Sequence, residues 1–404
     1  MISREAYIGR PFSVQAHLLP TITIIVLTLG SYQEKVRQMG ARYLPLEELA
    51  KVDAIEVEDY EAAVEEIYRL GWTDGLPVIL PTPRLVQRVL DYLGRRPEEV
   101  IGVIPPYQGV ATVEKIAINC VMAGCLPEHV PVVLAALRAM LKERFNLNGV
   151  QATTHCATPL SIVSGPVVER LGFNSRDNIF AGGCRANAAV GRAIRLILWN
   201  IGGGRAGELD KAVLGHPGKW SYCIAEDKEW NPWGPLHAER GFDAQESCVT
   251  VFAGEAPHHI MTGGGYSSPD KILTVLADSM ATAGNSTMQA GGDMVLLIGP
   301  LVARHLAEKG YSKSDVREAL IEKARKPVRL IKANEYLGES HPFHFSRFVD
   351  PRAEEALVPL VRRPENLLIL VAGGWGSGSG ICAFIPGWGQ HGGFAETEKI
   401  DFSN

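Results

Sequence analysis

The sequence lacks the patterns of several well-defined protein classes. It contains 7 cysteines, an odd number with no C-x-x-C spacing, which argues against a secreted disulfide framework, a thioredoxin-type dithiol and a zinc knuckle. It contains no run of Lys and Arg longer than a pair, and its 40 basic and 45 acidic residues give a net charge of only -5. Capture of nucleic acid by charge is therefore not expected, and a small-molecule partner is favoured.

No apolar stretch is long enough to span a bilayer. The most apolar early segment, 18–30, contains a proline and three threonines and is typical of a buried strand. Arg4 and Arg10 precede it as in a signal peptide, but no A-x-A-like cleavage site follows, so we expect a cytoplasmic protein with reduced thiols and no membrane contact. With 404 residues, 46% of them hydrophobic, the chain is long enough for two lobes with full cores.

Strand-like apolar runs alternate with helical patterns along most of the chain. Helical periodicity is present at three long segments, 57–71, 128–145 and 186–202. We therefore predict an α/β protein with mixed or parallel sheets covered by helices. An apolar run, a Gly-Pro or Thr-Pro pair and a helix recur at 71–94, 159–179 and 293–316. This recurrence indicates an internal repeat of strand, proline-containing turn and helix.

The periodic pattern is interrupted once, at 203–246, by three tryptophans and several prolines. A long irregular segment rich in aromatic residues is more typical of a binding loop or a subunit contact than of a linker, so we expect a homo-oligomer. The predicted organisation has four parts: an N-terminal strand and helix extension at 1–60, a first lobe at 61–205, an aromatic irregular segment at 206–260, and a second lobe at 261–404.

The first candidate site is the polar cluster T-T-H-C at residues 153–156. A cysteine becomes nucleophilic when a nearby cation or hydrogen bond stabilises its thiolate, and His155 could do this for Cys156 only if the backbone turns there. Thr153 and Thr154 would then contact a substrate. On an extended strand the two side chains point to opposite faces, and a buried, inert thiol is an equally good interpretation.

The second candidate site is the segment A-G-G-C-R-A-N at 181–187. Cys184, Arg185 and Asn187 lie where a helix is expected to begin, so backbone amides and the helix dipole could stabilise a thiolate or bind an anion. An ordinary capping turn, with Arg185 in an ion pair, is the alternative.

The third candidate site is the pair His258 and His259, which follows the strand expected at 247–253. One histidine could act as general base or bind zinc or iron together with His155 or Cys156. The sequence has no H-x-x-x-H or H-E-x-x-H spacing, so a polar loop is the more ordinary interpretation.

The fourth candidate site is the glycine-rich stretch after the strand expected at 366–372. Gly373 and Gly374 would let the backbone approach a ligand, and Trp375 could form the wall of a pocket. The stretch matches neither a Walker A loop nor a dinucleotide fingerprint, and a tight structural loop is equally expected.

Two weaker features accompany these sites. Asp74 in the turn G-W-T-D-G-L-P is expected to cap backbone amides, with a pocket carboxylate as the alternative. Cys120 and Cys125 would lie about 140° apart around a helix that includes both, so the sequence disfavours their pairing.

The motifs GWTDGLPV, ATVEKIAINCVMAG, GVQATTH, RANAAVGRAIRLILWNIGG and AGGWGSGSGICAFIPGWG resemble those of a large bacterial family without a settled activity. Its members are fused to, or encoded beside, small selenocysteine or cysteine proteins with a UGSC motif. The resemblance extends from about residue 60 to the C-terminus and implies thiol or selenol redox chemistry with a small partner protein. No C-G-S-C string occurs in this chain, and residues 376–380 read G-S-G-S-G.

Three hypotheses follow from these features. The favoured one is an enzyme that acts on a small anionic organic substrate in a thiol-linked redox or lyase step, through Cys156 or Cys184 with His155, His258 or His259 as acid or base. The second is a hydrolase or lyase in which the same side chains bind a divalent metal such as zinc, iron or nickel. The third is a non-catalytic partner subunit of a thiol or selenol redox enzyme. The sequence leaves open whether a cofactor is present.

Overall fold

The computed structural model describes residues 22–27, 52–334, 344–347, 349–376, 378–389 and 392–402. Within the expected extension at 1–60, the described strands are β1 (Ile22–Leu27) and β2 (Val52–Val57), which pair antiparallel. The rest of that extension up to residue 51 lies outside the described residues.

Two four-stranded sheets form the centre of the molecule. The first sheet has the order β14 (Glu396–Lys399), β7 (Cys248–Gly254), β5 (Thr158–Ser164) and β6 (Cys223–Ala225). The second sheet has the order β12 (Leu367–Val371), β9 (Met294–Ile298), β13 (Ile381–Pro386) and β8 (His258–Met261). Both sheets mix parallel and antiparallel pairs, which confirms the predicted α/β class.

The two sheets exchange strands. After β7 in the first sheet the chain crosses into β8 of the second, and after β13 in the second sheet it returns into β14 of the first. Residues 396–399, which the sequence placed in the second lobe, therefore belong to the sheet of the first lobe, because edge strands pair across the expected boundary. Each sheet has one parallel pair, β5 with β6 and β9 with β12. The internal repeat stays a prediction, and this shared arrangement supports it.

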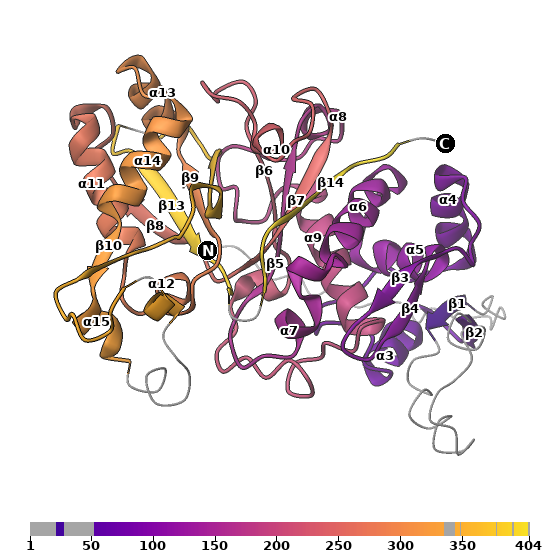
Figure 1. Cartoon of the computed structure of the whole chain (residues 1–404). Helices are drawn as coiled ribbons and strands as arrows, with labels where there is room; N and C mark the ends of the chain where they lie inside the picture. The colour runs from indigo at the N-terminus through magenta and orange to yellow at the C-terminus, as the bar shows by residue number, and fades with distance from the viewer. Residues whose placement is uncertain are drawn as a thin grey trace, which may run out of the picture.

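The sheets pack face to face, and helices cover their outer faces (Figure 1). Successive residues along a strand point alternately toward the other sheet and toward the helices. Val295, Leu297 and Phe252 lie between the sheets, whereas Leu296 and Val251 face the helices. Strands buried on both faces tend to be continuously apolar, and β9 and β12 are entirely so. The result is a four-layer arrangement of helices, sheet, sheet and helices.

On the side of the first sheet the helices are α3 (Tyr60–Arg69), α4 (Pro83–Leu93), α5 (Val113–Ala123), α6 (Val130–Met140), α7 (Leu147–Gln151), α8 (Val167–Arg170) and α9 (Arg185–Asn200). The short helix α10 (Leu236–Glu239) contacts β7 of the first sheet and β12 of the second, and its Leu236 is part of the core between them. On the side of the second sheet the helices are α11 (Pro269–Met280), α12 (Ser286–Ala290), α13 (Pro300–Glu308), α14 (Lys313–Lys323) and α15 (Val328–Lys332). Two short antiparallel pairs complete the fold: β3 (Val100–Ile104) with β4 (Gly109–Thr112), and β10 (Arg325–Pro327) with β11 (Leu357–Pro359).

The strand–Gly-Pro–helix unit is present at two of its three expected places. Strand β5 leads through Gly165 and Pro166 into α8, and β9 leads through Gly299 into α13. At 77–82, before α4, the chain is extended but forms no strand, because it has no partner strand in the described structure. No single helix among the described residues has the length and hydropathy needed to cross a membrane.

Candidate functional site

His155 pairs with a glutamate, not with the neighbouring cysteine. Its Nδ1 accepts a hydrogen bond from the Ala157 amide (3.1 Å), so the proton of the neutral ring is on Nε2, which donates to Glu255 Oε1 (2.9 Å). Burial disfavours the charged Glu255, but hydrogen bonds from His155 and Ser286 outweigh it and hold the pKa of Glu255 below its ordinary value. Both ring nitrogens of His155 thus have partners other than the Cys156 thiol, and its role as the base of Cys156 stays a prediction without support from these contacts.

Cys156 is half-buried, and its environment disfavours the thiolate. Burial raises the pKa of the Cys156 thiol, the negative charge of Glu255 raises it further, and the positive charge of Lys219 opposes them only in part. Of the two interpretations that the sequence left open, a raised pKa fits the buried thiol and not the thiolate activated by a neighbour. The two threonines before it contribute structurally: Thr153 Oγ1 accepts from the His155 amide, and the carbonyl of Thr154 accepts from the Val213 amide.

The residues at the start of α9 do not form the expected open anion site. The Cys184 thiol donates to the Gly172 carbonyl, and the Arg185 Nε donates to the Gly124 carbonyl (2.9 Å). Asn187 is buried, and its side-chain amide bonds to the backbone of Asn174 and Cys223. Asn187 therefore organises the protein's own loop, because its oxygen and nitrogen both have backbone partners.

His258 and His259 lie on β8 and are exposed. The ring of His258 packs 4.9 Å from that of Phe384 (centroid to centroid). His259 instead lines a cavity, which is described below. The described residues contain no group of three or more His, Cys, Asp and Glu side chains suited to a metal ion, so within this part of the chain the metal hypothesis has no ligand set.

The cavity beside His259 also contains the glycine-rich stretch. It measures about 350 Å³ and is lined by Gly373 and Gly374 after β12 and by Gly299 after β9. Two sites that the sequence treated separately are thus one place, at the carboxyl ends of the parallel strands of the second sheet. Trp375 packs edge-on against Trp230, with ring centroids 5.6 Å apart.

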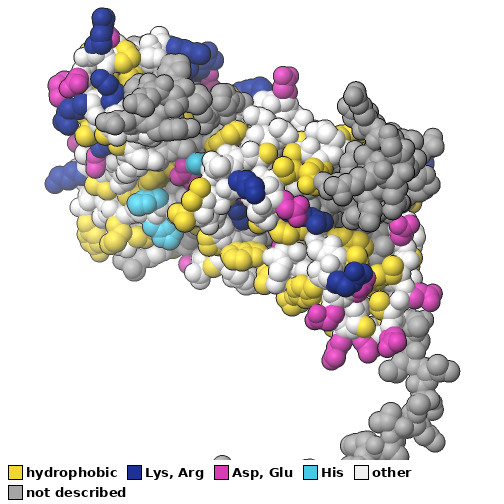
Figure 2. Space-filling model, turned by 90° about the horizontal axis from the view of Figure 1, so that it is seen from below, with side chains coloured by type: hydrophobic (Ala, Val, Ile, Leu, Met, Phe, Trp, Pro, Cys, Tyr) yellow, Lys and Arg dark blue, Asp and Glu magenta, His cyan; other side chains and the backbone are white. Residues whose placement is uncertain are grey.

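A larger cavity, of about 570 Å³, lies along helix α9; we call it the α9 cavity. It is formed by α9, by the turn containing Asp74, and by the irregular segment at 206–220. The polar and aromatic side chains that line it are Asp74, Arg195, Trp199, Asp210, His216, Lys219 and Trp220. The segment at 206–220 runs along the lower side of the molecule in Figure 1. Figure 2 shows that side, where Lys and Arg side chains lie among hydrophobic ones with histidines nearby.

The charges in the α9 cavity are unequal. Asp210 Oδ2 lies 2.6 Å from Lys219 Nζ and 3.8 Å from an Arg195 nitrogen, so one carboxylate forms ion pairs with two cations. Arg195 is held in place by hydrogen bonds to the Lys219 carbonyl (3.0 Å) and to Gln151. Burial lowers the pKa of Lys219, while Asp210 raises it in part. Burial lowers the pKa of His216 to about 4, so this ring is neutral at physiological pH.

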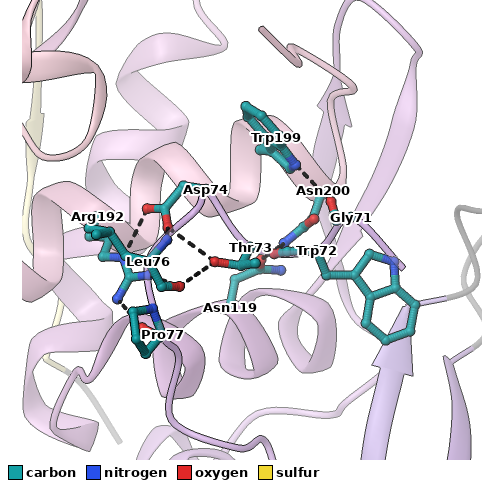
Figure 3. A network of polar contacts seen from close by, with 10 residues as sticks. All are labelled: Gly71, Trp72, Thr73, Asp74, Leu76, Pro77, Asn119, Arg192, Trp199 and Asn200. Carbon is teal, nitrogen blue, oxygen red and sulfur yellow. Dashed lines mark hydrogen bonds and ion pairs between the residues drawn. The ribbon is translucent and has the colours of Figure 1, made fainter. Parts of the chain in front are cut away.

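The wall containing Asp74 is fixed by hydrogen bonds to α9 (Figure 3). Arg192 donates to both carboxylate oxygens of Asp74 (2.9 and 2.7 Å) and to the carbonyls of Leu76 and Pro77. The Leu76 amide donates to Asp74 Oδ1, which confirms the predicted amide cap. Asp74 also interacts electrostatically with Arg195, but with Arg192 counted the cations at the cavity still outnumber the carboxylates Asp74 and Asp210.

Cys156 lies close enough to Lys219 for their charges to interact, although it does not line the α9 cavity itself. The backbone at 153–154 also bonds to the amides of Lys211 and Val213, which lie in the cavity segment. Sequence analysis missed Arg195, Asp210, His216 and Lys219. The concentration of tryptophans, histidine and glycines in the aperiodic segment at 203–246 could have indicated Asp210, His216 and Lys219, whereas no such signal marked Arg195, which lies on α9.

Comparison of the chain with models of known protein families finds no match, and comparison with curated proteins finds no similar sequence.

Proposed function

We propose that this chain is an enzyme that binds a small organic anion in the α9 cavity and acts on it through the Cys156 thiol, in a thiol-linked redox or lyase step. The observation that carries the proposal is an excess of positive charge: Arg192, Arg195 and Lys219 lie against only two carboxylates, those of Asp74 and Asp210. An anion entering the cavity would complete this charge balance, as buried charges require a partner.

The geometry also suggests how the thiol would work. A raised pKa keeps Cys156 protonated in the free protein, so nucleophilic attack by its sulfur must be coupled to loss of the proton. Glu255 is the ionisable neighbour that could accept it, since its carboxylate acts electrostatically on the thiol, whereas Lys219 already carries its proton in the ion pair with Asp210. Trp199 and Trp220 provide apolar walls for the uncharged part of a substrate.

The proposal is tested by alkylating Cys156 with two reagents of the same reactive group, anionic iodoacetate and neutral iodoacetamide, and measuring each rate by peptide mass spectrometry. Attraction by Arg195 and Lys219 is expected to raise the ratio of the iodoacetate rate to the iodoacetamide rate at Cys156 roughly tenfold over that of free glutathione. Lys219→Met is expected to bring the ratio back toward that of glutathione.

Lys211→Met is the matched control, because Lys211 lies in the same segment but is exposed and does not line the cavity. A Cys156 ratio equal to that of glutathione in the native protein, or one unchanged by Lys219→Met, contradicts anion binding beside this thiol. An unreactive Cys156 at all pH values up to 9 contradicts the thiol step itself.

Further properties stay proposals. All seven cysteines are free, in keeping with a reducing cytoplasm. The exposed Val213 and Leu214 and the half-exposed Trp220 at the cavity segment support a contact with a second copy or with a small thiol or selenol redox protein. The molar mass of the purified chain, measured by light scattering, distinguishes a homo-oligomer from a monomer whose surface would be covered by a different protein.

A further inference from the structure

The structure brings Cys120 and Cys125 together at the end of α5. The helix ends at Ala123, and Gly124 adopts a left-handed conformation (φ 91°) that turns the chain back. The Cys125 amide then donates to the Cys120 carbonyl (2.9 Å), a helix-end motif in which these two positions meet. The expected separation of about 140° fails because Cys125 lies beyond the helix. Both thiols are free, and each interacts with the other.

Two polar groups flank Cys125. The His129 Nδ1 accepts from the Leu126 amide (3.2 Å), which places the ring proton on Nε2, and this ring hydrogen-bonds the Cys125 sulfur. Arg185 is held beside the turn by its hydrogen bond to the Gly124 carbonyl. Cys120 is 0% exposed and Cys125 8%, so Cys125 is the nearer of the two to solvent.

These contacts give the two thiols different roles. The hydrogen bond from Cys120 lowers the pKa of Cys125, burial opposes it, and His129 and Arg185 add to the lowering, which leaves the pKa at about 7. Burial and the neighbouring Cys125 raise the pKa of Cys120 well above its ordinary value. Cys125 is thus the thiolate of the pair, and Cys120 is the thiol that donates to it.

We propose that Cys120 and Cys125 form a redox site, separate from the α9 cavity, that is oxidised to a disulfide by hydrogen peroxide. The Cys125 thiolate attacks one peroxide oxygen: an S–O bond forms, the O–O bond breaks, and the leaving hydroxide takes a proton to become water. The Cys120 sulfur then attacks the Cys125 sulfur, the S–O bond breaks, and the second hydroxide leaves as water with the Cys120 proton. Two thiols are oxidised and one peroxide is reduced to two waters, and an external dithiol reverses the change.

The test uses the full chain and the tryptic peptide 116–138, which contains these two cysteines and no other. After brief exposure to dilute hydrogen peroxide, free thiols are alkylated and the peptide is weighed. We expect it to be unalkylated and lighter by two hydrogens, and to become doubly alkylated after dithiothreitol. In Cys120→Ser we expect Cys125 to be trapped by dimedone as the sulfenic acid. Cys223 is the internal control, because it is buried nearby and burial raises its thiol pKa far above the ordinary value.

A second pair of variants keeps the test independent of whether Cys120→Ser folds. Arg185→Gln changes an exposed side chain and is expected to slow oxidation of Cys125 at pH 6 by roughly 3- to 10-fold, because the thiolate fraction falls tenfold per unit rise in pKa. Arg88→Gln, on the exposed face of α4, should change nothing. Oxidation of Cys125 no faster than that of Cys223, or a rate that Arg185→Gln leaves unchanged, overturns the proposal.

Discussion

The substitution Arg192→Met tests how the wall of the α9 cavity is held. Arg192 makes four hydrogen bonds, two to the Asp74 carboxylate and one each to the carbonyls of Leu76 and Pro77. The side chains of Arg192 and Asp74 are 15% and 7% exposed, so the pair is largely buried. Methionine keeps much of the apolar stem of arginine but removes every donor, which leaves the Asp74 charge without its partner.

Removing one partner of a buried ion pair typically costs 3 to 5 kcal/mol, and we expect the lower end, about 3 kcal/mol, because Asp74 keeps the hydrogen bond from the Leu76 amide.

The pH dependence of this loss gives a second expectation. In the native protein burial raises the pKa of Asp74, but Arg192 more than offsets it, so the pKa is lowered. Without Arg192 the burial effect remains, and the pKa of Asp74 should rise above its ordinary value of 3.8. The variant can then bind a proton that the native protein does not, so its deficit should be smaller at pH 4.5 than at pH 7.

Urea unfolding followed by tryptophan fluorescence at both pH values measures these deficits, with Arg88→Met as the exposed control, expected within about 0.5 kcal/mol of the native protein. The double variant Asp74→Asn/Arg192→Met should be more stable than Arg192→Met alone, because the buried charge is gone. A loss below about 1 kcal/mol at pH 7, or a double variant that recovers nothing, would refute the assignment of this pair as the anchor of the wall.

Two further predictions concern buried or half-buried carboxyl groups. Burial raises the pKa of Glu226 to about 7, a folded-state value above its unfolded 4.5, so its contribution to stability is complete below about pH 4.5 and lost as pH rises through 7. In the native protein the unfolding free energy should fall by up to about 3 kcal/mol between pH 4.5 and 8 because of Glu226, and Glu226→Gln should abolish this part of the fall. A variant whose unfolding free energy, measured with urea, depends on pH as in the native protein contradicts this. Glu255→Gln should lower the pKa of Cys156, since the Glu255 charge raises it, and speed iodoacetamide labelling of Cys156 at pH 7.5 roughly threefold. Slower labelling would contradict the proximity of the two groups.

The elements of the fold were predictable where local signals were strong. The Thr-Pro pair marked the start of α4, and apolar runs marked β5, β7, β9 and β12. These signals depend on a few neighbouring residues, so the sequence contains them directly. The exchange of β8 and β14 between the sheets was not predictable, because strand pairing depends on partners far away in the chain.

The candidate site was harder to predict for the same reason. His155 and Cys156 are adjacent in sequence, but the partner of His155 is Glu255, 100 positions away. The cation whose charge lowers the pKa of Cys156 is Lys219. Nothing in the sequence around His155 and Cys156 indicated either partner. Cys120 and Cys125 show the opposite error: a helical interpretation separated them, and a single glycine with positive φ brought them together.

The opposite pKa shifts of Cys156 and Cys125 follow from the same physical terms. Burial disfavours the thiolate at both positions. At Cys156 burial is the largest cause and the Glu255 carboxylate adds to it, so the pKa rises, whereas at Cys125 the hydrogen bonds from Cys120 and His129 and the charge of Arg185 outweigh burial, so the pKa falls. Near neutral pH the two thiols are therefore in different states, one protonated and one partly ionised. Oxidants are therefore expected to react with Cys125 first and to leave Cys156, which lies beside the α9 cavity, reduced.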